Sequence, residues 1–194
     1  MIKPSAGSAA TLAICGVVPA LVSCSQISGT ADMMGAALRT AAEPPETTPH
    51  ALLRISTDGY TWVQPGTACE WTGNPRGGIA VTANQIYIGA RGFTGRVLGV
   101  VGDAPKGLSS GELRVAANEP VTVAYSAFWT VGNLNYNCYT FRSFVPVQGA
   151  HYQLLTSANT TQRRCGMVAL QLAPVPLVVP LVVQMADAPK CKLP

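Results

Sequence analysis

Few side chains in this sequence are of the kinds that carry out catalysis. It has two histidines, His50 and His151, and a serine hydrolase would have to recruit one of them as its general base. No Gly-x-Ser-x-Gly segment is present to expose a serine nucleophile. The nine acidic residues are scattered, so they give no positive sign of the paired carboxylates that a glycosidase uses. The sequence therefore predicts a protein that is not an enzyme, and it predicts His151 to be a surface or turn residue.

The segment Gly89–Arg96 superficially suggests a phosphate-binding loop, because three of its eight residues are glycine. Its spacing is neither GxGxxG nor GxxxxGK(S/T), and no helix is predicted after it to present its N-terminus to a phosphate. We expect a glycine-rich turn between strands, whose arginines could still contact an anionic ligand.

The N-terminus has the pattern of an export signal. Lys3 is its one charged residue before Asp32, and an apolar stretch, Ala9–Ala20, lies between them. The stretch ends in Leu21-Val22-Ser23-Cys24. Two alternatives are a plain secretory signal and an uncleaved membrane span, but Gly16, Pro19 and the polar residues after Ser23 disfavour a span.

Leu21-Val22-Ser23-Cys24 resembles the lipobox of bacterial lipoprotein signal peptides. The resemblance implies that residues 1–23 are removed and that Cys24 carries acyl chains such as palmitate. Several chains on one cysteine hold a protein stably at a membrane. The family's sorting rule, with Ser25 rather than aspartate after the cysteine, favours the outer membrane over the inner one in a Gram-negative cell. The covalent lipid is the one attached group we expect, with no cofactor.

The remaining cysteines suit an oxidising compartment. With Cys24 acylated and Cys15 in the signal, four are left: Cys69, Cys138, Cys165 and Cys191. Four cysteines in an exported chain imply two disulfides with three possible pairings. No CxxC pair is present, and with two histidines a zinc site would have to be all-thiolate, so no metal is predicted.

The composition indicates a compact envelope protein. Charged residues make up 11% of the chain, against about 25% in typical globular proteins, while 48% of the residues are apolar. The net charge is +4 without a basic run, so no footprint for nucleic acid is present. Residues 24–49, which include Glu43-Pro44-Pro45-Glu46, are expected to form a flexible tether.

From His50 to Pro194 the pattern is one of short strands. Asp58-Gly59 between two apolar runs predicts a hairpin, and Gly66–Gly78 predicts a long loop that carries Cys69 and Trp71. Val121–Ala127 alternates as a half-buried strand does. The proline-broken run Leu177–Val183 is expected at a sheet edge or against a sheet face. Further strands are predicted at 79–81, 85–88, 96–101, 112–116, 138–145, 152–157 and 165–172, the last three forming an antiparallel meander.

These strands predict an all-β fold for residues 50–194, a single antiparallel β-sandwich or small barrel. The block from Cys138 to Cys165 also resembles the later half of small bacterial lipoproteins of uncharacterised function, and the resemblance implies an immunoglobulin-like sandwich. Cys138 and Cys165 begin the first and third strands of the meander, which places them at the same end. We therefore expect a Cys138–Cys165 disulfide, and by elimination Cys69–Cys191.

Four aromatic residues give a modest hint of binding. Phe128, Trp129, Tyr136 and Tyr139 cluster around a polar loop, where they could contact a protein partner or a glycan, or could close one end of the sandwich core. The sequence thus predicts a membrane-anchored envelope lipoprotein that serves as a non-enzymatic binding or structural module, with an envelope protein as a possible partner. The alternative is a periplasmic or surface hydrolase that acts on a cell-wall or glycan substrate.

Overall fold

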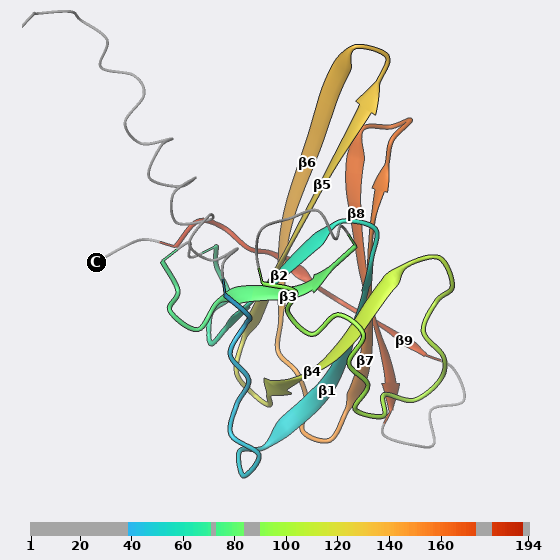
Figure 1. Cartoon of the computed structure of the whole chain (residues 1–194). Coiled ribbons are helices and arrows are strands. Elements are labelled where there is room, and N and C mark those ends of the chain that lie inside the picture. The colour runs from blue at the N-terminus through green and yellow to red at the C-terminus, as the bar shows by residue number, and fades with distance from the viewer. Residues whose placement is uncertain (1–38, 71–72, 84–89, 174–179, 192–194) are drawn as a thin grey trace, which may run out of the picture.

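The computed structural model describes residues 39–70, 73–83, 90–173 and 180–191 (Figure 1). These residues form ten strands in two five-stranded sheets, without a helix among them. The two sheets face each other and do not close into a barrel, so the expected all-β sandwich is confirmed.

The first sheet contains one parallel pair. Its strands, in spatial order, are β4 (Ser109–Ala116), β1 (His50–Thr57), β7 (His151–Asn159), β8 (Arg164–Ala173) and β9 (Leu181–Val183). β1 runs parallel to β7, and every other pair is antiparallel. The expected purely antiparallel sandwich is therefore corrected to a mixed one.

The second sheet is antiparallel throughout. Its strands, in spatial order, are β10 (Ala186–Asp187), β6 (Leu134–Phe144), β5 (Val121–Val131), β2 (Tyr60–Pro65) and β3 (Gly78–Thr82). Apolar side chains from both sheets fill the space between them because alternate residues of each strand point inward. The fully buried members include Leu53, Ile55, Val63, Val81, Leu113, Val123 and Leu154.

The turn at Asp58-Gly59 is not a hairpin. β1 and β2 belong to different sheets, so the chain crosses from one sheet to the other there. Neither residue has the positive φ that the usual two-residue hairpin turns require. Gly59 instead allows close approach, because a Cβ at this position would lie 2.4 Å from the carbonyl oxygen of Ser126. The Asp58 carboxylate completes the corner by accepting hydrogen bonds from the Tyr125 hydroxyl and the Ala158 N–H.

Two other local predictions were wrong. Residues 96–101 form an irregular segment rather than a strand, because three successive N–H groups in it point to a single carboxylate. The strand at Val121–Ala127 is buried on both of its faces rather than one. The strand predicted at 85–88 lies outside the described residues, as do Trp71 and residues 177–179 of the run Leu177–Val183. The described end of that last run, β9, is an edge strand as expected.

The described end of the predicted tether packs on the domain. Thr40 bridges to Ile79, and Ala41 is buried in the core with a backbone hydrogen bond to Ile79. Glu43 forms ion pairs with Arg96 and Arg114. Residues 39–49 are therefore part of the packed domain, whereas the tether prediction had extended to Pro49. Residues 24–38 lie outside the described part of the chain.

Both expected disulfides are present, although one stated reason for them was wrong. Cys138 is bonded to Cys165 and Cys69 to Cys191. β6 and β8 are not strands of one meander, because the chain changes sheets between β6 and β7. The Cys138–Cys165 bond therefore joins the two sheets. The second disulfide fixes the C-terminal segment to the loop after β2, where Glu70 and Lys190 also form a backbone bridge.

Candidate functional site

Two hairpins extend beyond the sandwich and form an arm, here defined as Ala127–Cys138 of β5–β6 and Ser157–Cys165 of β7–β8 (Figure 1). β2 pairs with β5 as far as Ser126, and β1 pairs with β7 as far as Thr156. Beyond Ser126 and Thr156, β5 is no longer paired with β2 and β7 is no longer paired with β1. The Cys138–Cys165 bond joins the hairpins, so that they project as one cross-linked unit.

The four aromatic residues singled out from the sequence all lie on this arm, but on two different faces. Trp129 and Tyr136 are a cross-strand pair with stacked rings, 5.9 Å between centroids. The Arg163 guanidinium lies 4.4 Å from the centre of the Tyr136 ring, so this pair faces the β7–β8 hairpin. These rings and the cation stiffen the arm by stacking.

Phe128 and Tyr139 lie on the other face, exposed by 62% and 47%. Their rings meet edge to face at 6.2 Å. They do not close the end of the sandwich core, which was the alternative to partner contact for this cluster. An exposed aromatic pair on a projecting strand face is a surface that a partner can reach.

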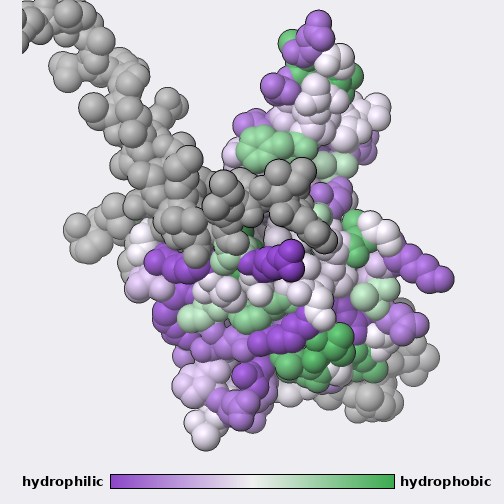
Figure 2. Space-filling view, in the orientation of Figure 1, coloured by the Kyte–Doolittle hydropathy of each residue, from purple (hydrophilic) through white to green (hydrophobic). Residues whose placement is uncertain are grey.

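The arm ends in further exposed apolar side chains. Val131 and Leu134 flank the turn Gly132-Asn133 and are exposed by 56% and 62%. Figure 2 shows hydrophobic and hydrophilic residues side by side at this projecting end. Sequence reasoning missed both residues, because it placed Leu134 in a polar loop, Gly132–Asn135, and assigned no role to Val131. The alternation of apolar and polar residues from Leu134 to Cys138 was the available signal for a strand.

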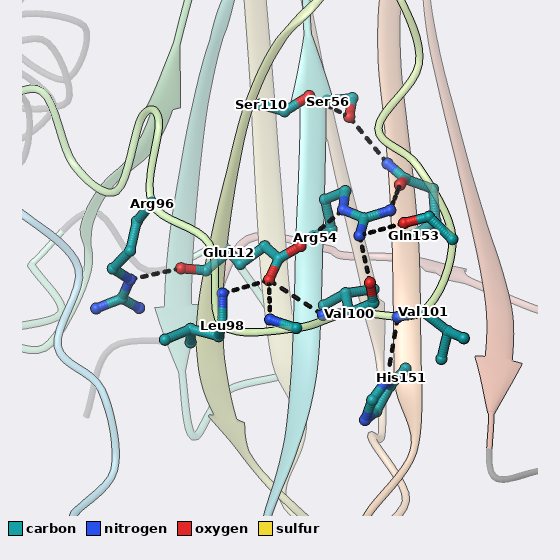
Figure 3. A network of polar contacts seen from close by, with 12 residues as sticks. Arg54, Ser56, Arg96, Leu98, Val100, Val101, Ser110, Glu112, His151 and Gln153 are labelled. Carbon is teal, nitrogen blue, oxygen red and sulfur yellow. Dashed lines mark hydrogen bonds and ion pairs between the residues drawn. The ribbon is translucent and has the colours of Figure 1, made fainter.

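A buried polar network lies on the outer side of the first sheet, across β4, β1 and β7 (Figure 3). Arg54 on β1 and Glu112 on β4 form an ion pair of 2.8 Å, with 6% and 3% of their side chains exposed. Arg54 also donates to the carbonyl oxygens of Val100 and Gly102. The second oxygen of Glu112 accepts the N–H groups of residues 98, 99 and 100. Arg54 and Glu112 come together because they lie directly opposite each other in the β1–β4 register.

The charged groups of Arg54 and Glu112 are bonded to partners within the domain. Burial alone would raise the pKa of Glu112, but the three N–H groups and Arg54 outweigh it and lower that pKa below its ordinary value of 4.5. Gln153 joins Arg54 to the hydroxyl of Ser56, which in turn meets Ser110. The carboxylate is therefore held ionised, with 3% of the side chain exposed. Its role is to fasten residues 96–103 to the sheet.

Glu43 fastens the N-terminal segment in the same way. It pairs with Arg96 and Arg114, and it accepts the backbone N–H of Arg114 at 2.6 Å. Burial would raise the pKa of Glu43, but these contacts lower it. Arg96 is thus occupied by Glu43 and lies against the Phe93 ring. In the described part of the glycine-rich segment, Arg91 is the arginine left exposed, and residues 93 and 95 are turn residues, as expected.

The two histidines are not placed next to a nucleophile by any described contact. The Nδ1 atom of His151 accepts the Val101 N–H, and Nδ1 of His50 lies 2.8 Å from the Thr48 carbonyl oxygen. Within the described residues, no group of three metal-ligating side chains comes together. None of those residues forms a helix of the length and apolarity that crossing a bilayer requires. Cys24 lies outside the described part of the chain.

No protein-family model matches this chain, and neither the curated proteins nor the solved structures include a significant match. The function of this chain therefore has to be inferred from its own side chains.

Proposed function

We propose that this protein is an envelope lipoprotein, anchored through Cys24, whose folded domain is a non-enzymatic binding module. The observation that carries the proposal is the arm, a cross-linked projection that exposes Phe128 and Tyr139 on one face. Large exposed apolar side chains on a projection cost solubility unless they meet a partner. The described buried carboxylates, by contrast, are occupied by arginine and backbone partners.

The arm is suited to binding because it is rigid before contact. Trp129, Tyr136 and Arg163 stack within it, and the disulfide ties its two hairpins. A pre-organised surface loses little conformational entropy on association, so more of its contact energy appears as affinity. The proposed contact residues are therefore Phe128 and Tyr139, with Trp129 and Tyr136 as the support behind them.

Photo-crosslinking in intact cells tests this proposal. A photoreactive phenylalanine analogue at position 128 should form adducts, whereas the same group at exposed Lys106, which lies on a loop outside the arm, should not. Equal labelling at the two sites would contradict a binding role for the arm. Turnover of cell-wall glycan by the purified protein would contradict the non-enzymatic assignment and favour the hydrolase alternative.

A further inference from the structure

We infer that the end of the arm inserts into an anionic lipid surface. This inference rests on the proposed binding role of the arm and names its partner class. The apolar side chains of Val131 and Leu134 flank the turn at the end of the projection, and both are more than half exposed. Phe128 is a third large apolar side chain, exposed by 62% just behind them.

The charge of the arm is of one sign. No Asp or Glu occurs between Glu119 and Asp187, whereas Arg163 and Arg164 lie exposed at the turn of the second hairpin. Asp58 approaches the base of the arm, where its carboxylate is occupied by the Tyr125 hydroxyl and the Ala158 N–H. Two arginines without a nearby carboxylate attract a surface that carries negative charge.

The order of side chains along the arm matches the layers of a bilayer interface. A strand advances about 3.3 Å per residue. Phe128 therefore lies roughly 10 Å behind Val131, and Tyr136 with its stacked Arg163 lies roughly 7 Å behind Leu134. Interfacial segments bury their apolar side about 5–10 Å into the boundary between headgroups and acyl chains. With the apolar end inserted, the guanidinium would reach the depth of the lipid phosphates, and the aromatic rings would lie in the interfacial belt.

The small size of the end favours lipid over an acidic protein. A stable protein interface buries about 800 Å² on each partner and needs roughly 20–30 residues a side. At the end of the arm the large exposed apolar side chains are only Val131 and Leu134, with Phe128 behind them. Insertion into lipid needs no such area, because each buried apolar side chain and each cation contributes separately.

The test uses the full-length protein as isolated from membranes, with Asn133→Cys carrying an environment-sensitive fluorophore. In phosphatidylcholine vesicles that contain phosphatidylglycerol, its emission should shift to the blue and become protected from aqueous quenchers. It should stay unshifted in pure phosphatidylcholine vesicles or in high salt. Val131→Ser with Leu134→Ser should abolish the shift, and the matched pair Val97→Ser with Val101→Ser, exposed residues outside the arm, should not.

Charge variants separate electrostatics from ring stacking. Arg163→Gln with Arg164→Gln should shift the equilibrium toward the free arm about 30-fold, since each cation near an anionic surface contributes about 1 kcal/mol. Replacing both by lysine should retain insertion, as should Arg91→Gln with Lys106→Gln. An unshifted probe in every vesicle would overturn the lipid assignment. If residue 128 crosslinked to an acidic envelope protein at the same time, the binding role would stand with a protein partner.

Discussion

Glu112 holds the irregular segment 96–103 by accepting three backbone N–H groups on one oxygen and Arg54 on the other. Sequence inspection did not find this pair, because 58 positions separate its members and no motif links them. What brings them together is the β1–β4 register. A buried ion pair costs desolvation, so it stabilises only when every charged atom has a partner, as here.

At the residue scale, Glu112→Gln should destabilise the domain strongly. The amide leaves the buried Arg54 guanidinium without a counter-ion and turns a donor toward the N–H groups of residues 98–100. We expect the free energy of unfolding to fall by about 3 kcal/mol or more, measured by urea unfolding followed by circular dichroism. Asp187→Asn, which breaks the exposed pair with Arg142, should cost less than about 1 kcal/mol. Equal effects would mean that the network is not a stabilising one.

The same carboxylates predict the acid limit of the fold. The pKa values of Glu43 and Glu112 are lowered in the folded state, so each contributes stability above its unfolded pKa, ordinarily 4.5. That contribution is lost as the pH falls below 4.5 and through the lower, folded-state values. The free energy of unfolding should therefore drop on acidification, and the gap between wild type and Glu112→Gln should narrow. A gap that stayed constant from neutral to acidic pH would contradict this linkage.

At the scale of elements, the corner at Gly59 fixes how the two sheets connect. Gly59→Ala places a Cβ 2.4 Å from the Ser126 carbonyl oxygen and 2.9 Å from the Tyr125 ring, both inside the sandwich. We expect a cost of roughly 1–3 kcal/mol, typical of overpacking. Gly166→Ala is the matched control, since its nearest contact would be an ordinary 3.5 Å. Thermal unfolding of the two variants compares them, and equal melting temperatures would show that the corner can relax.

The two disulfides should differ in how much stability each contributes and in which part of the domain is loosened when each is removed. On the loop-entropy relation, a closure of 122 residues is worth about 5 kcal/mol and one of 27 residues about 3.5 kcal/mol. Replacing Cys69 and Cys191 by serine should therefore lower stability more than replacing Cys138 and Cys165. Replacing Cys138 and Cys165 should also speed amide hydrogen exchange within the arm and leave exchange in β1 and β4 slow. Exchange that rose evenly across the domain would contradict the arm as a locally tied unit.

The positions of most strands could be predicted from the sequence, but their partners could not. Alternation and turn residues located β3, β4, β7 and β8 to within a few residues. Asp58-Gly59 has hairpin composition, yet it forms a corner, because the turn residues do not encode which sheet the next strand joins. The predicted strand at 96–101 failed for a related reason. Its apolar residues were read as a strand, whereas the distant Glu112 captured its N–H groups.

At the scale of the whole molecule, the anchor prediction concerns Cys24. Cys24→Ala removes the thiol that the lipidation reaction needs, so the protein should move from the membrane fraction to the soluble fraction of lysed cells. Cys15→Ala, which changes the other N-terminal cysteine, is the control and should leave partitioning unchanged. Unaltered membrane partitioning of the Cys24 variant would contradict lipidation at this residue.

The candidate site was only partly visible in the sequence. The aromatic residues at 128, 129, 136 and 139 were found by composition, but their division into an exposed pair and a supporting pair depends on strand register. The arm projects because β1 pairs with β7 only as far as Thr156 and β2 pairs with β5 only as far as Ser126. These limits are a property of the whole sandwich. No local pattern carries that information.

The parallel β1–β7 pair has a consequence for the order of folding. Leu53 and Ile55 are fully buried on β1, yet the strands that pair with β1 lie some 60 and 100 positions further along the chain. Such distant pairing makes folding slow, because the entropy of closing long loops is lost before the contacts form. A nascent chain that ended after β6 would leave one edge of β1 unpaired. We therefore expect the first sheet to form only after β7 has been made.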